Sequence, residues 1–379
     1  MIVFYSMKMS FKIGSIYNIP IKIHFTFIFI LALFTYVLSV ETVSILGFKI
    51  GFGDYSFLLV YKILLGVLAS IILFACVSFH ELGHSILTKK YGFSIRNITL
   101  FVFGGSSKTE EMPRDPKKEM KIAIIGPTVS ISLGLAFYAA SIFVTPFTNV
   151  FAGNILYSLF STLSFYNLIL AGFNLIPAFP IDGGRILRSG LALKMDYQKA
   201  TKTASAIGKG LAIGLGIFGI FFNLWLVLIA IFIYFGAYQE EKTAEISDAL
   251  KGVNIEELME TDIKSVTSNH TLDELYESMK NEKSLVVPVV EDEKFVGIAT
   301  INQLQSINQK YWPEVHVNQV MNKNVNAVNP DADAFSVFKK LMRKNIDRMF
   351  VKKDGKLLGM ISQQDLIKTI RFHGMNQKL

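Results

Sequence analysis

Long apolar segments are the feature that most constrains how this chain can fold. Six of them approach or exceed the length needed to cross a hydrocarbon core of about 30 Å. Apolar residues make up 51% of the chain and charged residues only 18%, a balance that is too apolar for a soluble enzyme of this size. The sequence therefore predicts a polytopic α-helical membrane bundle of about six transmembrane helices within residues 1–244. The six segments are about 23–40, 57–87, 121–145, 155–176, 204–221 and 223–239.

Positive charge is concentrated in alternate loops between these segments. A net charge of +8 could indicate nucleic-acid binding, but this loop pattern follows the positive-inside rule, so no nucleic-acid partner is expected. The pattern predicts a multi-pass protein of the cell membrane with both termini in the cytoplasm. The charged loops contain Lys8, Lys12 and Lys22; Lys89, Lys90, Arg96, Lys108, Arg114, Lys117 and Lys118; and Arg185, Arg188, Lys194, Lys199 and Lys202.

The chain changes character after Gln239. The stretch EEKTAEISDALKG is charged and indicates a linker or a solvated helix, and a duplicated segment with strand-like and amphipathic runs follows it. Two gapless copies, residues 250–311 and 312–379, keep a constant offset of 62 positions, as from Gly297 to Gly359. Such short repeats bury their faces poorly alone, so we expect an α/β tail in which the two copies pair.

Residues 80–84 read HELGH, inside the second apolar segment. His80 and His84 would share one face of a helix and could both bind one Zn²⁺, with Glu81 beside the metal as a general base. The alternative is that both histidines only satisfy hydrogen bonds within a packed helix. Ionisable groups are costly in a membrane, which favours the functional interpretation.

A catalytic zinc site needs a third protein ligand, and Asp182 is the best candidate. It follows two prolines that must interrupt the helix, and Gly183 and Gly184 after it permit a tight turn. Alternatively, Asp182 only caps a helix. His24 is a weaker candidate that could instead make a hydrogen bond.

HELGH together with NLIPAFPIDGG (174–184) resembles the paired signatures of the site-2 proteases, which are intramembrane zinc metalloproteases. The segments FVFGG (101–105) and GPTVS (126–130) support the resemblance, which covers about residues 15–245. It implies that His80, His84 and Asp182 bind zinc, that Glu81 activates water, and that Asn174 faces the substrate. Ser130 stands where the family often has Asn, a departure that we expect to leave the catalytic residues untouched.

The resemblance also implies a substrate and a mechanism. Zinc-bound water attacks the peptide carbonyl, and Glu81 passes its proton to the leaving amine. The substrate is expected to be a single membrane-spanning protein segment that unwinds and lies extended along the FVFGG strand.

The paired tail repeats resemble CBS domains, which bind adenosine nucleotides such as ATP, ADP or AMP. The ribose-contacting string appears as Gly359, Ser362 and Asp365 in the second copy. The first copy has Thr300 but then Gln303, and an amide binds two ribose hydroxyls less well than a carboxylate does. We therefore expect one competent nucleotide site and one impaired site. The alternative is a structural tail, or one that forms a homodimer.

Two other functions remain open from the sequence. A CBS-regulated transporter or channel could place His80 and His84 on an ion path, although Glu81 and the Asp-Gly-Gly motif would then be unexplained. A protease-like fold could instead bind and sequester membrane partners, but the complete catalytic set argues against that hypothesis.

Overall fold

The computed structural model describes residues 10–56, 58–101, 104–109, 115–147 and 151–376. They form two compact units, Met1–Lys242 and Thr243–Leu379. Each unit contains hydrophobic clusters of its own.

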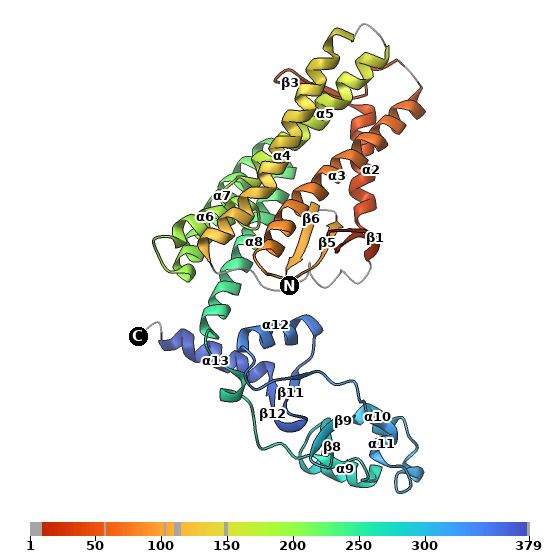
Figure 1. The fold of residues 1–379 in the computed structure, drawn as a ribbon, viewed down its shortest axis with the longest axis vertical. Helices are drawn as coiled ribbons and strands as arrows, with labels where there is room; N and C mark the ends of the chain where they lie inside the picture. The colour runs from red at the N-terminus through yellow and green to blue at the C-terminus, as the bar shows by residue number, and fades with distance from the viewer. Residues whose placement is uncertain (1–9, 57, 102–103, 110–114, 148–150, 377–379) are drawn as a thin grey trace. The chain divides into compact units, whose positions relative to one another are not determined.

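Long helices dominate the first unit, and three of them, α3, α4 and α5, run side by side (Figure 1). Among the described residues, five helices are long and apolar enough to cross a membrane, which confirms the multi-pass helical prediction. A single residue, Asn223, separates the last two. The bounds are α3 (Leu59–Lys90), α4 (Pro116–Val144), α5 (Phe151–Asn174), α7 (Tyr197–Phe222) and α8 (Leu224–Ala249).

The first apolar segment forms a shorter helix than expected. α2 spans Phe27–Val40, and its 14 residues are about 21 Å long, less than a bilayer core. The preceding residues belong to strand β2 (Ile19–His24), where a buried position alternates with a partly exposed one at its start. That alternation suits a strand with one covered face, so the expected segment at 23–40 begins inside the sheet.

A four-stranded sheet lies beside the helices (Figure 1). Its order is β1-β2-β5-β6; β2 and β5 are parallel and the other neighbours antiparallel. Among the described strands, β6 has β5 as its one neighbour and therefore forms an edge of the sheet. The remaining strands are β1 (Ser10–Ile16), β5 (Ile95–Phe101) and β6 (Gly104–Thr109), with a separate hairpin of β3 (Thr42–Ile45) and β4 (Phe48–Gly51).

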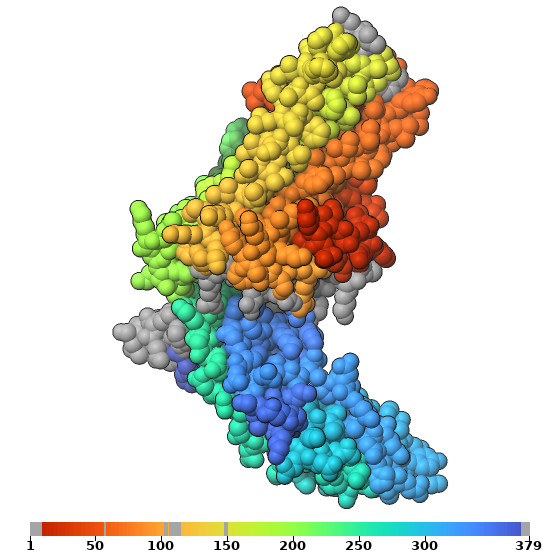
Figure 2. Space-filling view, viewed as in Figure 1, coloured from red at the N-terminus to blue at the C-terminus, as the bar shows by residue number. Residues whose placement is uncertain are grey.

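Close packing of α3, α4 and α5 holds the bundle together, and the space-filling view shows α3 and α4 in contact along one face (Figure 2). Gly83 lets α3 approach Val129 of α4, and Gly134 lets α4 approach Leu168 of α5. Large apolar side chains remain exposed on the outer faces of the helices, as lipid contact requires. Examples are Leu64, Ile71, Leu135, Ile142, Ile217 and Leu228.

The second unit contains the two repeats in one six-stranded sheet of order β10-β11-β12-β9-β8-β7. The central neighbours β9 and β12 come from different copies and are antiparallel, so the copies pair as expected. The first copy contributes β7 (Val266–Thr267), α9 (Leu272–Asn281), β8 (Val286–Glu291), β9 (Lys294–Thr300) and α10 (Ile301–Gln305). The second contributes β10 (Ala327–Val328), α12 (Ala334–Lys344), β11 (Arg348–Lys353), β12 (Lys356–Ser362) and α13 (Gln363–Asn376), after the short helix α11 (Val317–Val320).

The two copies exchange the segments with which they begin. Leu250 and Ile255, at the start of the first copy, are fully buried in the core of the second. Trp312 and Val317, at the start of the second copy, pack in the core of the first. Each core is therefore completed by a segment that comes from the other side of the duplication.

Candidate active site

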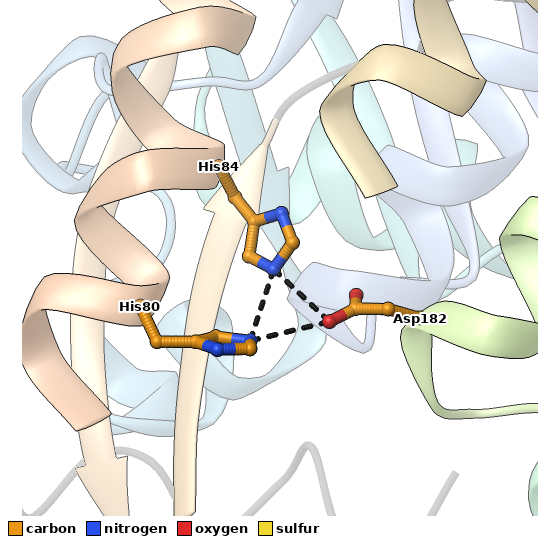
Figure 3. A group of neighbouring side chains, drawn as sticks. All are labelled: His80, His84 and Asp182. Carbon is orange, nitrogen blue, oxygen red and sulfur yellow. Dashed lines mark hydrogen bonds and ion pairs between the residues drawn. The ribbon is translucent and has the colours of Figure 1, made fainter. Parts of the chain in front are cut away.

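His80, His84 and Asp182 meet in the first unit (Figure 3). The two histidines lie on successive turns of α3, and Asp182 is the first residue of α6 (Asp182–Ala192). His80 Nε2 and His84 Nε2 are 3.2 Å apart, and they lie 3.2 and 3.1 Å from Asp182 Oδ2. All three residues are buried, with exposed fractions of 3%, 6% and 8%.

The donor set fits a zinc ion. His84 Nδ1 lies 2.6 Å from the carbonyl oxygen of Ile122, which can only accept, so Nδ1 bears the proton and a neutral ring presents a lone pair at Nε2. This lone pair faces a carboxylate oxygen, an arrangement that is repulsive unless a cation lies between them. In a tetrahedral zinc site the donor atoms are about 3.3 Å apart, close to the separations of the three atoms here. Two imidazoles and one carboxylate also form a donor set of catalytic zinc sites.

α4 orients both imidazoles. The Ile122 carbonyl fixes the His84 ring, and Ser130 Oγ lies 2.9 Å from His80 Nδ1. Hydrogen bonds of this kind set the tautomer and ring direction of metal-binding histidines. Ser130 therefore contacts one of the predicted zinc ligands directly, and the expectation that its identity leaves the catalytic residues untouched is wrong.

Gly126 provides the space in which the two imidazoles converge. A Cβ at this position would overlap with Nε2 of both His80 and His84. Gly126 lies one helical turn from Ile122 and one from Ser130, so one face of α4 provides two hydrogen-bond partners and the gap between them. The absence of a side chain is thus part of the site.

Glu81 follows His80 in α3 and lies against the sheet. A Cβ on Gly105 would overlap with the Glu81 side chain, so β6 passes immediately beside this carboxylate. In the FVFGG segment, Phe101 ends β5 and Gly104 begins β6, and residues 102–103 lie outside the described part of the chain.

The connection between α5 and α6 places Asp182. The helix ends at Asn174, as the prolines predict, and Gly183 and Gly184 permit close contact between the first turn of α6 and the connection. A Cβ on either glycine would overlap with the backbone of that connection. Asp182 thus presents its carboxyl group to both imidazoles from the first turn of α6.

Two other sequence candidates lie outside this cluster of three. Asn174 donates from Nδ2 to the carbonyl of Leu170, within its own helix. His24 is buried at the end of β2, and its Nδ1 lies 2.8 Å from Thr26 Oγ1. The structure thus gives His24 a hydrogen-bonding position and leaves the substrate role of Asn174 a prediction.

The predicted nucleotide residues all take part in helix caps. In the first copy, Thr300 N donates to Gln303 Oε1 at 2.8 Å, at the start of α10. In the second copy, Ser362 Oγ donates to Asp365 Oδ2 at 2.5 Å, at the start of α13. Gln303 and Asp365 therefore accept equivalent hydrogen bonds at the starts of their helices, but only Asp365, in the second copy, is a carboxylate.

Sequence reasoning missed Ile122 and Gly126 as parts of the site. The sequence contained a hint of their role, because residues 122, 126 and 130 are spaced four apart and therefore share one face of α4. That face lies against the two histidines. Ile122 acts through its backbone, however, and its side chain gave no clue.

Comparison with protein families gives two matches. The model of peptidase family M50 matches residues 68–152 and 144–215, which include HELGH and Asp182. The CBS domain model matches residues 255–307 and 317–371, one match for each tail repeat.

Similar proteins come from archaea and bacteria. The zinc metalloprotease MJ0392 of Methanocaldococcus jannaschii is 36% identical over 374 residues, covering 98% of this chain and 99% of the relative. Stage IV sporulation protein FB of Bacillus subtilis is 33% identical over 134 residues, 35% of this chain and 43% of the relative. The solved structure of the site-2 protease from M. jannaschii shares 38% identity over 61% of this chain and 95% of that chain, with a TM-score of 0.43. Because the similarity to MJ0392 extends over nearly the whole of both chains, this protein belongs to the site-2 proteases of peptidase family M50, the zinc metalloproteases, in a form that also has two CBS domains.

Proposed function

We propose that this zinc metalloprotease hydrolyses peptide bonds within the transmembrane segments of other membrane proteins. The observation that supports this most directly is the convergence of two imidazoles and one carboxylate on α3 and α6, within a bundle whose helices are long enough to cross a bilayer. The protease domain is residues 1–244, and the tail repeats are residues 250–311 and 312–379.

His80, His84 and Asp182 would hold one Zn²⁺ per chain. When bound, zinc lowers the pKa of a coordinated water toward neutrality and polarises a peptide carbonyl. Glu81 lies one position after His80, where its carboxylate accepts the proton of the attacking water and returns it to the leaving amine. The contacts from Ile122 and Ser130 hold the imidazoles in place during these transfers.

The substrate would lie extended against β6. A peptide bond in a transmembrane helix is protected by the helix, so the segment must unwind before it is cleaved. Among the described strands β6 lies at the edge of its sheet, and sheet edges can bind extended peptides. Gly105 brings this strand next to Glu81, and Asn174 would contact the substrate near the same site.

The location follows from charge. We place the protein in the cell membrane with both termini in the cytoplasm, because the Lys-rich and Arg-rich loops alternate with loops that have few positive charges. The zinc site, toward the end of α3 that includes Lys89 and Lys90, would then lie near the cytoplasmic face, where water can reach it.

The CBS pair would bind an adenosine nucleotide and modulate the protease. Thr300, Ser362 and Asp365 are the proposed contacts, and the carboxylate of Asp365 favours the second copy for ribose binding. Asp365 Oδ2 accepts from Ser362, while Oδ1 lies 3.6 Å from Lys368 Nζ. The same module is a candidate surface for homodimer formation.

The decisive experiment is cleavage of a model single-span substrate by purified protein in detergent, with Glu81→Gln as the comparison. We expect the variant to bind one zinc per chain, as the wild type does, and to lose cleavage by several orders of magnitude. A zinc chelator should abolish wild-type cleavage, and added ATP or AMP should change its rate. If Glu81→Gln cleaves as well as the wild type, Glu81 is not the general base, and if the zinc-loaded wild type cleaves none of several such substrates, the proposed function is wrong.

A further inference from the structure

A buried ion-pair cluster surrounds Arg188, six residues after Asp182 in α6. Arg188 is 5% exposed and Glu119, in the first turn of α4, is 1% exposed. Arg188 Nε donates to Glu119 Oε1 at 2.9 Å, and Nη2 donates to the same oxygen. Nη1 donates to Glu240 Oε2 of α8 at 3.0 Å.

Aromatic rings complete the surroundings of the guanidinium. Its central carbon lies 4.8 Å from the ring centre of Phe179, in the α5–α6 connection, and 5.1 Å from that of Tyr197, at the start of α7. One side chain of α6 thus joins α4, α7, α8 and the connection that leads to Asp182. The planar, five-donor guanidinium is suited to this, whereas a lysine ammonium is a single point charge.

The cluster connects the two helices that define the metal centre. Glu119 precedes Ile122 by three positions and Gly126 by seven, so it lies on the face of α4 that contacts the imidazoles. Arg188 lies on the helix that begins with Asp182. Fixing Glu119 to Arg188 therefore fixes the His84 hydrogen-bond acceptor relative to Asp182.

Stability alone is a poor explanation for this cluster. A buried ion pair often contributes no more stability than apolar side chains of similar size, because both charges lose their water. Glu119 Oε2 is also buried without a hydrogen-bond partner among the described residues. A cluster with this cost is better explained by the geometry that it defines.

We infer that Arg188 is a positioning residue for the metal centre, which holds α4 and α6 in the register that brings Asp182 to His80 and His84. This inference rests on the proposed zinc site. Arg188 is not one of the three proposed zinc ligands and acts through Glu119 and its own helix. The contact with Glu240 adds α8 to the same cluster, so a displacement of α8 would also move α6, the helix that begins with Asp182.

The test compares Arg188→Met, Arg188→Lys and Glu119→Gln with the wild type. Zinc affinity is measured by competition with a chromophoric chelator, and geometry by the visible absorption spectrum of the cobalt-substituted protein. We expect Arg188→Met to bind zinc about 10- to 100-fold more weakly, the usual range for loss of an outer contact, with an altered cobalt spectrum. Arg188→Lys should bind zinc more tightly than Arg188→Met but more weakly than the wild type. The zinc affinity of Glu119→Gln should also lie between those of the wild type and Arg188→Met.

Lys209→Met provides the matched control. Lys209 Nζ lies 2.6 Å from Glu241 Oε2, an ion pair that joins α7 to α8 without involving α4 or α6. We expect this variant to keep wild-type zinc affinity and cobalt spectrum. Equal weakening in Lys209→Met and Arg188→Met would indicate general loosening of the bundle and overturn the inference.

The remaining outcomes are equally decisive. If Arg188→Met does not fold, Arg188→Lys and Glu119→Gln provide the answer, with size-exclusion profiles showing that they are folded. Unchanged zinc affinity and cobalt spectra in both folded variants would refute the positioning role. In the wild type, zinc binding without cleavage would contradict the proposed function but leave this inference intact, since its readout is the metal.

Discussion

At the scale of single residues, the proposed zinc site depends on the absence of a side chain at Gly126. The Nε2 atoms of His80 and His84 occupy space that any side chain on Gly126 would fill. The same face of α4 supplies the Ile122 carbonyl and the Ser130 hydroxyl, both of which orient an imidazole. The geometry of the metal centre is therefore set as much by α4, which contributes no ligand, as by α3.

Replacing Gly126 with alanine should damage zinc binding more than it damages folding. The new Cβ must push both imidazoles away from Asp182, so we expect zinc affinity to fall at least tenfold, as measured by chelator competition. Gly190→Ala is the matched control, because among the described residues a Cβ there meets only Met120 Cε, at an ordinary contact distance of 3.8 Å. That control should keep its zinc affinity and gain up to about 1 kcal/mol of stability. Wild-type zinc affinity in Gly126→Ala would contradict the geometry described for the site.

The three convergent side chains could be predicted from the sequence, because HELGH fixes the spacing of the two histidines and Asp182 is a carboxylate beside a helix break. The buried position of Arg188 could not be predicted in this way, because a buried ion pair depends on which helices pack together. Glu119, Arg188 and Glu240 are far apart in the chain, and each by itself looks like a solvated charge in a loop or at a helix end. The contact of Ser130 with His80 was missed for a similar reason, because it needs the relative rotation of α3 and α4.

At the scale of elements, the tail repeats differ at one matching helix start. Gln303 and Asp365 occupy equivalent positions at the starts of α10 and α13, and each accepts a hydrogen bond from the backbone N–H of the residue that caps its helix. The duplication was predicted from a constant offset in the sequence, and the paired sheet agrees with it. The exchange of leading segments could not be predicted, because apolar residues such as Leu250 and Trp312 fit equally well in either core from the pattern alone.

Converting Gln303 to aspartate should give the first copy a competent nucleotide site. A carboxylate at this position accepts two ribose hydroxyls, as proposed for Asp365. We expect nucleotide stoichiometry to rise from one to two per chain, as measured by isothermal titration calorimetry with AMP or ATP. The neighbouring change Asn302→Asp adds the same charge and should leave the stoichiometry at one. A stoichiometry of one in Gln303→Asp would show that the first copy is closed for another reason.

At the scale of the whole molecule, the chain has two compact units with separate hydrophobic clusters. The proposed zinc ligands belong to the first unit and the predicted nucleotide residues to the second. Each unit contains one of the two tryptophans, whose fluorescence can follow its unfolding. Trp225 is 64% exposed on α8, and Trp312 is 8% exposed in the core of the first repeat.

Zinc removal should therefore destabilise the first unit alone. A ligand at 100 times its dissociation constant stabilises the folded state by about 2.7 kcal/mol, and chelation removes that contribution. In Trp225→Phe, fluorescence follows Trp312 only, and we expect its unfolding transition to be unchanged by chelator. Calorimetry of the same protein should show a second transition that shifts to lower temperature. A shift of the Trp312 transition would demonstrate energetic coupling between the units.

The exchanged segments of the tail have a consequence for how such a module can arise and be dissected. A fragment that ended after the first repeat would lack the stretch containing Trp312 and Val317, and its own leading stretch with Leu250 and Ile255 would have no core to enter. Leu250 and Ile255 stand 62 positions before Trp312 and Val317, so two such fragments could complete their cores by each inserting its leading stretch into the other. The tail therefore resembles a segment-exchanged dimer whose two subunits are joined in one polypeptide. Its sequence consists of two copies, but neither copy has a complete core without the other.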